Sequence, residues 1–213
     1  MNLIIFASTV IAAIVIAIAI KKSNNSMEKE RQEFFERERQ ANFVRKKSLD
    51  GLNYVHIPAK FLDYDYSTAL DANDASGRGR DALDKLMFLA DSKVVNFSGM
   101  SNTDLKLEYG TANLTILSEY DQNFTALVRS LQTLAELTSD IDKSFSIELL
   151  EYSVDIGTDM STTYKLLIDS YSSLYGEGEN FHIKKEALLE KASNLNSVMA
   201  PSIIRYIENN YNN

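Results

Sequence analysis

Hydrophobic and polar positions are distributed very unevenly along the chain, and the first apolar run is the longest. It extends without a charge from Leu3 to Ile20 and stops at the pair Lys21-Lys22. A helix over this run, at about 1.5 Å per residue, reaches about 27 Å, close to the thickness of a hydrocarbon core of about 30 Å. The pattern predicts a transmembrane anchor over residues 1–22, inserted through Leu3–Ile20.

A cleaved secretory signal is the alternative interpretation of this run, and Ala17 and Ala19 resemble a weak cleavage site. Such signals carry basic residues before an apolar stretch of about 7–15 residues. Here no charged side chain precedes the run, and lysines follow it. We therefore expect the anchor to be retained.

Charge differs strongly between the next segment and the remainder. Residues 21–47 hold nine basic and five acidic side chains, whereas residues 48–213 hold thirteen basic and twenty-five acidic ones. Because basic residues stay on the cytoplasmic side, we expect a single-pass protein in the cell membrane with its N-terminus outside and its body in the cytoplasm. The basic segment would contact anionic lipid or remain a solvated stalk, and the acidic body disfavours nucleic acid as a partner.

Residues 23–47 read as a charged helical stem, in which Met27, Phe34 and Ala41 are spaced by seven. Three such positions are too few for a coiled coil, so the pattern predicts a spacer helix. Residues 48–80 form a linker whose first part, 48–66, is expected to be an extended strap because of its β-branched residues and Pro58. The strap either lies over this chain's own helices or docks into a groove of another molecule.

From Asp81 onward the apolar positions recur with helical spacing. Short connections between amphipathic helices indicate antiparallel hairpins stacked side by side. The expected fold class is all-α, with a transmembrane helix, a helical stem and an α-solenoid of stacked helix pairs over residues 81–213. The predicted helices are Asp81–Ser92, Thr103–Ser118, Tyr120–Thr138, Lys143–Ile156, Ser161–Tyr175, Ile183–Leu195 and Val198–Asn210.

An internal repeat supports this expectation. The segment 149–156 (LLEYSVDI) recurs 39 residues later as 188–195 (LLEKASNL), and an amphipathic helix follows each copy. Residues 126–210 therefore resemble a degenerate tetratricopeptide repeat, a helix–turn–helix unit of about 34 residues. Ile168 departs from the small residue usual at its position, and the closing prolines are absent. The resemblance implies a concave surface that binds a protein or peptide.

A second resemblance rests on residues 101–114 (SNTDLKLEYGTANL) and 157–159 (GTD). These segments are similar to an uncharacterised group of single-pass proteins with helical-repeat bodies. No activity is attached to that group, so the resemblance implies an architecture and no reaction.

Candidate catalytic chemistry is scarce. The chain has no cysteine, and its two histidines, His56 and His182, lie in no ligand or nucleophile pattern. The acidic residues from Asp63 to Asp74 only roughly follow the spacing of a calcium loop, and Gly77–Arg80 is a weak match to a phosphate loop. We expect no enzyme activity, catalytic residue, cofactor or metal.

The sequence as a whole predicts a membrane-tethered scaffold or adaptor that binds a protein or peptide. Asn113, Tyr164 and Tyr171 are the candidate contact residues, and Leu150, Leu167, Leu189 and Ile207 are the expected core. One alternative is a structural component of a membrane complex that self-associates through its anchor and stem. A second alternative is an enzyme whose site the sequence does not reveal.

Overall fold

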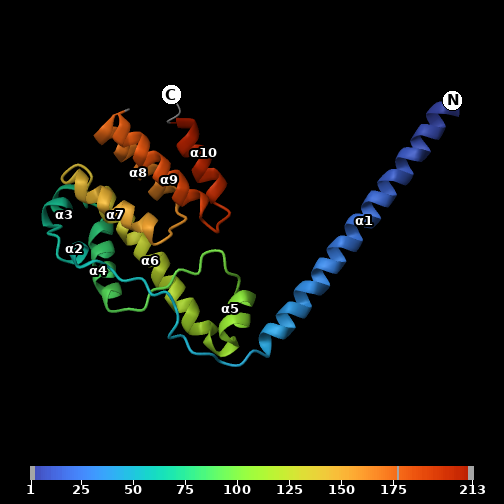
Figure 1. Ribbon diagram of the computed structural model, residues 1–213, viewed down its shortest axis with the longest axis horizontal. Helices are drawn as coiled ribbons and strands as arrows, with labels where there is room; N and C mark the ends of the chain where they lie inside the picture. Colours follow the sequence, from blue (N-terminus) through green and yellow to red (C-terminus); the bar gives the residue numbers. More distant parts are fainter. Residues whose placement is uncertain (1–2, 177, 211–213) are drawn as a thin grey trace. The chain divides into compact units, whose positions relative to one another are not determined.

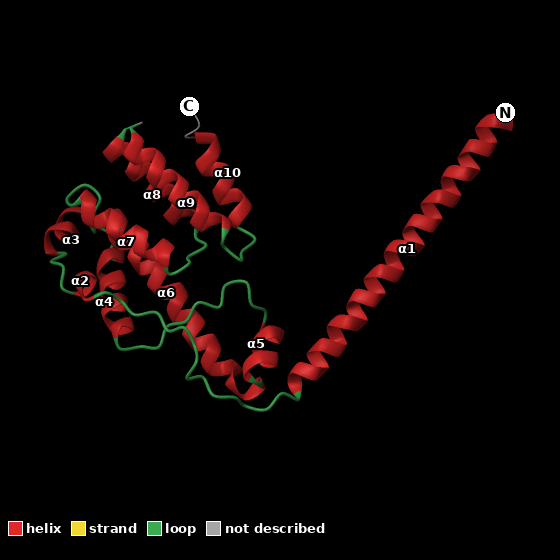
Figure 2. Ribbon diagram, viewed as in Figure 1, coloured by secondary structure: helices red, strands yellow, loops and turns green. Residues whose placement is uncertain are grey.

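The structure is a computed structural model that describes residues 3–176 and 178–210, with side chains described from residue 14 to residue 209. In the described residues the regular secondary structure is helical, joined by loops and without a β-strand, as Figures 1 and 2 show, so the all-α prediction is confirmed. The helices are α1 (Leu3–Asn42), α2 (Ala59–Leu62), α3 (Ser67–Asn73), α4 (Arg78–Ala90), α5 (Asn102–Tyr109), α6 (Leu114–Thr138), α7 (Lys143–Asp155), α8 (Ser161–Tyr175), α9 (Glu179–Ser193) and α10 (Ala200–Asn210), with a 3₁₀ turn, η1, at Thr111–Asn113.

The chain divides into two compact units. The stem unit comprises residues 1–48 together with 101–114, and the core unit comprises residues 49–100 together with 115–213. The segment 101–114, predicted as part of the repeat domain, is thus grouped with the stem.

The prediction of a transmembrane anchor is wrong. In the part of the chain that the structure describes, no helix is sufficiently long and apolar to cross a membrane. The described apolar side chains of α1 run only from Ile14 to Ile20, about 10 Å of helix, and Lys21 begins a polar stretch. Side chains before Ile14 lie outside the described residues. The single-pass membrane placement and its orientation are therefore withdrawn with the anchor.

The stem unit is held together where the end of α1 meets α5 (Figure 1). Glu38 forms an ion pair with Lys106 and accepts a hydrogen bond of 2.5 Å from the Thr103 hydroxyl. Ala41 is fully buried in this contact. The stem helix is thus anchored by its last turns and stands exposed over the remaining described length.

The predicted helix Thr103–Ser118 is interrupted, and Gly110 is the reason. Its φ is +88°, and a Cβ at this position would lie 2.3 Å from the carbonyl oxygen of Arg45. Only glycine permits both the left-handed backbone and this close approach. The chain therefore ends α5 at Tyr109 and starts a new helix, α6, four residues after Gly110.

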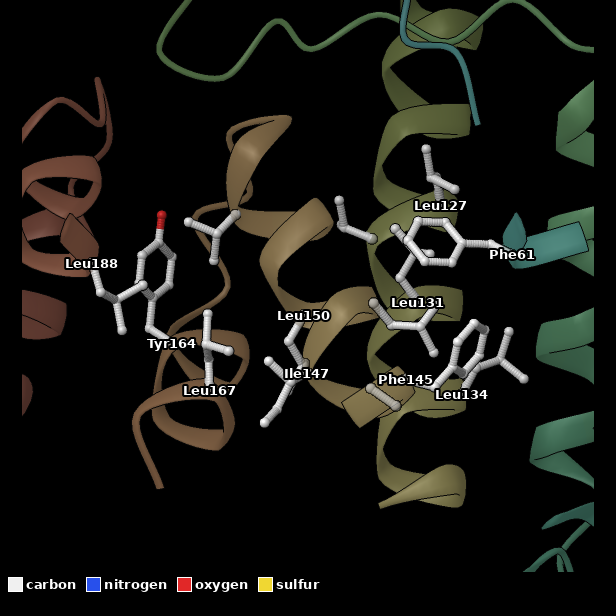
Figure 3. Packing of buried hydrophobic residues seen from close by; sticks show 14 of the residues in the cluster. Phe61, Leu127, Leu131, Leu134, Phe145, Ile147, Leu150, Tyr164, Leu167 and Leu188 are labelled. Atoms are coloured by element: carbon white, nitrogen blue, oxygen red, sulfur yellow. The ribbon is translucent and has the colours of Figure 1, made fainter. Parts of the chain in front are cut away.

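The core unit is built around α6 to α10, which follow one another as packed neighbours. α7 packs on α8, α8 on α9, and α10 on both α9 and α8. Figure 3 shows the core passing from α6 through α7 and α8 to α9, with Tyr164 beside Leu188. Of the expected core residues, Leu150, Leu167 and Ile207 are buried and Leu189 is half-buried.

The strap lies on the core unit of its own chain. Val55 donates a backbone hydrogen bond of 2.9 Å to Val94, and Tyr54 pairs with Val95 in an isolated antiparallel bridge. Pro58 then precedes α2, whose Phe61 is fully buried against Phe145. The strap is thus extended in its first half only, and two short helices, α2 and α3, follow where the sequence suggested none.

The 39-residue repeat is visible in the burial pattern. Leu149 and Leu188 are buried at equivalent places of α7 and α9, and the small residues Ser153 and Ala192 are fully buried one turn later. The following helices repeat the correspondence, with Ile168 and Ile207 both fully buried. This pattern explains the internal similarity as two equivalent helix pairs, whereas membership of the tetratricopeptide family stays a prediction.

Candidate functional site

The candidate site is a pocket where α7, α8 and α9 meet, which we call the α7–α9 groove. Its volume is about 240 Å³. Val154, Leu167 and Leu188 supply buried apolar walls, and Ala187 reaches it from the exposed side of α9. The groove is lined by Glu151, Val154, Asp155, Leu167, Tyr171, Lys184, Ala187, Leu188 and Lys191.

Charged pairs bridge α7 and α9 along this groove. Lys184 Nζ donates to Glu151 Oε1 at 2.6 Å, and Lys191 pairs with Asp155 one turn further along α7 and two turns further along α9. The two ion pairs lie along the same groove because residues 151 and 155 share one face of α7. Residues 184 and 191 likewise share one face of α9. The rim therefore carries two positive and two negative side chains that neutralise one another.

Three titratable groups of the groove, Glu151, Lys184 and Tyr171, have shifted pKa values. Burial alone would raise the pKa of Glu151, but hydrogen bonds from Lys184 and Tyr171 outweigh it and keep that pKa below 4.5. The bond to Glu151 raises the pKa of Lys184, and burial raises that of Tyr171. A general acid or base works best with a pKa near the working pH, so this arrangement suits binding better than proton transfer.

The three predicted contact residues lie in three different places. Tyr171 lines the groove and donates a hydrogen bond of 2.7 Å to Glu151. Tyr164 is buried between α8 and α9, and its hydroxyl donates to the Thr158 carbonyl at 3.1 Å (Figure 3).

Asn113 belongs to the stem unit and is also buried. Its amide donates to the carbonyl oxygens of Lys47 at 2.8 Å and Tyr109 at 2.7 Å. These bonds tie the segment after α1 to the end of α5. Asn113 thus has a structural role there, and of the three residues Tyr171 is the one that lines the α7–α9 groove.

Gly77–Arg80 starts α4, and the chain's own Asp74 occupies the position that a phosphate would take. The backbone amides of Gly79 and Arg80 each donate to the Asp74 carboxylate at 2.9 Å. These bonds are the main reason that the pKa of Asp74 is lowered. The helix start is thus capped internally.

Of the groove residues, Tyr171 was expected from the sequence as a contact residue and Leu167 as a core residue, whereas the charged residues of the rim were not singled out. Glu151, Asp155, Lys184 and Lys191 look like ordinary surface charges of amphipathic helices. The one available signal was the repeat itself, which places α7 and α9 in equivalent positions. No family model, curated protein or solved structure matches the chain.

Proposed function

We propose that the chain is a protein-interaction module that binds a segment of a partner protein at the α7–α9 groove. The observation that carries the proposal is the groove's combination of apolar walls with a rim of paired charges. Such a site takes an apolar side chain as an anchor and offers the rim charges to the partner's polar groups.

The size of the groove favours a side chain over a cofactor. Sites for small molecules and cofactors usually measure about 300–1,000 Å³. The α7–α9 groove, at about 240 Å³, is smaller. The pKa directions of Glu151, Lys184 and Tyr171 agree with this choice, since each group is kept in one charge state near neutral pH.

The test is a peptide-display selection on the full chain, repeated with Ala187→Trp. Ala187 is exposed and lines the groove, so a larger side chain there fills the groove without disturbing the core. His182→Trp, on another face of the same helix, is the matched control. We expect selected peptides to share an apolar anchor and to lose binding to Ala187→Trp only. Peptides that bind both variants equally would refute the groove as the site.

A second candidate function is self-association through α1. From Ile14 to Ile20 the helix exposes Ile14, Ile16, Ile18 and Ile20 by more than half of their surface, and exposed apolar patches of this kind mark association sites. Sedimentation velocity of the full chain tests it. An oligomer that dissociates in Ile16→Lys supports the structural role, and a monomer at all concentrations contradicts it.

A further inference from the structure

A second groove lies between α4 and α6, and its charge differs from that of the α7–α9 groove. We call it the basic groove. It has a volume of about 310 Å³. It is lined by Arg78, Asp81, Ala82 and Lys85 of α4 and by Ala126, Arg129, Ser130 and Thr133 of α6.

Three cations and one carboxylate face this groove. None of Arg78, Lys85 and Arg129 forms an ion pair with any side chain in the described part of the chain. Arg78 donates to the Ser76 hydroxyl at 3.1 Å, and the Lys85 ammonium lies 5.0 Å from the centre of the Phe88 ring. Residues 48–213 carry almost twice as many acidic as basic side chains, so three unpaired cations around one groove are a specific concentration of positive charge.

Two hydroxyl side chains of α6 also line the groove. Ser130 and Thr133 lie three residues apart, on the same face of the helix. A hydroxyl can both donate and accept a hydrogen bond. These two groups can therefore bond the backbone of a segment that enters the groove.

The spacing of the cations indicates the shape of the ligand. Arg78 and Lys85 are seven residues apart on α4, which is about 10 Å along the helix axis. An extended peptide covers that distance in about three residues. A small anion between the two cations would be repelled by Asp81, which lies between them in sequence and also lines the groove, whereas an extended segment can place backbone amides there.

We propose that the basic groove binds an extended, carboxylate-rich segment of a partner protein. Arg78, Lys85 and Arg129 pair with its acidic side chains, while Asp81 accepts from its backbone amides and Ser130 and Thr133 bond its backbone carbonyls. This site is separate from the α7–α9 groove, and the inference does not depend on the proposed function of that groove.

The experiment uses the full chain and a fluorescein-labelled peptide of alternating glutamate and serine, with the glutamine analogue as the negative control. Binding is followed by fluorescence anisotropy at low salt and at about 0.15 M salt, where surface charges are screened over about 8 Å. Arg129→Gln and Lys85→Gln remove groove cations at exposed positions, and Arg205→Gln removes an exposed cation of α10 as the matched control.

We expect the glutamate peptide to bind more weakly as salt rises and the glutamine peptide not to bind. Arg129→Gln should weaken binding about tenfold, as expected for loss of a charge-assisted contact, and Arg205→Gln by less than about twofold. Ala187→Trp should leave this binding unchanged, which separates it from the α7–α9 groove. Equal losses in Arg129→Gln and Arg205→Gln, binding of the glutamine peptide, or displacement by equimolar inorganic phosphate would overturn the proposal.

Discussion

The Tyr171 hydroxyl and the Lys184 ammonium donate to the same oxygen of Glu151, at 2.7 Å and 2.6 Å. One carboxylate of α7 therefore fixes side chains of both α8 and α9 at the edge of the α7–α9 groove. Because Tyr171 is buried, its hydroxyl depends on this acceptor.

Acidification should weaken this junction. The folded pKa of Glu151 lies below its unfolded value of 4.5, so its contribution to stability is fully present above pH 4.5 and is lost as the pH falls through the folded pKa. Chemical denaturation of the wild type and of Glu151→Gln between pH 3 and pH 7 measures the contribution of Glu151 to stability. The difference in the free energy of unfolding between the wild type and the variant should be constant at the upper end of this pH range and shrink below about pH 4.5. A difference that grows on acidification would contradict the assignment.

Replacing Ser153 by alanine should stabilise the protein. Its hydroxyl oxygen is fully buried without a hydrogen-bond partner among the described residues, and Ala192 stands at the equivalent position of the repeat. We expect a gain of about 1 kcal/mol, or about 2–4 °C in the unfolding temperature, measured by thermal denaturation.

Ser146→Ala is the matched control for Ser153→Ala, because it also lies buried on α7. Its hydroxyl donates to the Ala135 carbonyl at 2.7 Å, so its removal should destabilise the protein by about 1 kcal/mol. Changes of the same sign in both variants would show that the hydrogen-bond state of the hydroxyl does not decide the outcome.

Gly110→Ala should loosen the stem unit. A Cβ would lie 2.3 Å from the Arg45 carbonyl oxygen, and the amide of neighbouring Lys47 donates to Tyr109 at 3.0 Å. Hydrogen exchange should show lost protection at Lys47. Gly77→Ala has a similar positive φ but no atom within 4 Å of its Cβ, so it should cost only about 1 kcal/mol of local backbone strain and leave Lys47 protected.

Asp74→Ala should remove the cap of α4. Losing the bonds to the amides of Gly79 and Arg80 should cost about 1–2 kcal/mol in chemical denaturation. Asp71→Ala, which removes only an exposed ion pair with Arg80 at 3.6 Å, should stay within about 0.5 kcal/mol. Equal effects of the two substitutions would argue against the capping role.

Apolar periodicity alone determined the helical fold, and it placed α8 at the residues where the structure has it. It succeeded there because a helix that buries one face must repeat its apolar positions every three to four residues. The prediction of a membrane anchor at Leu3–Ile20 failed, because no described helix is long and apolar enough to cross a membrane. The run is only the first part of one helix, Leu3–Asn42, which continues into the charged stem. Apolar periodicity also missed the break at Gly110, because the reason is the distant carbonyl oxygen of Arg45.

The candidate sites depended almost entirely on tertiary structure. Tyr171 was identifiable from its spacing, but only packing showed that it meets Glu151 and Lys184, which lie 20 residues before it and 13 after it in the chain. In the same way, Arg129 is an ordinary surface cation in the sequence and becomes part of a basic groove only beside α4. Local pattern fixes which helix face is buried, whereas the pairing of charges between helices is decided by how those helices pack.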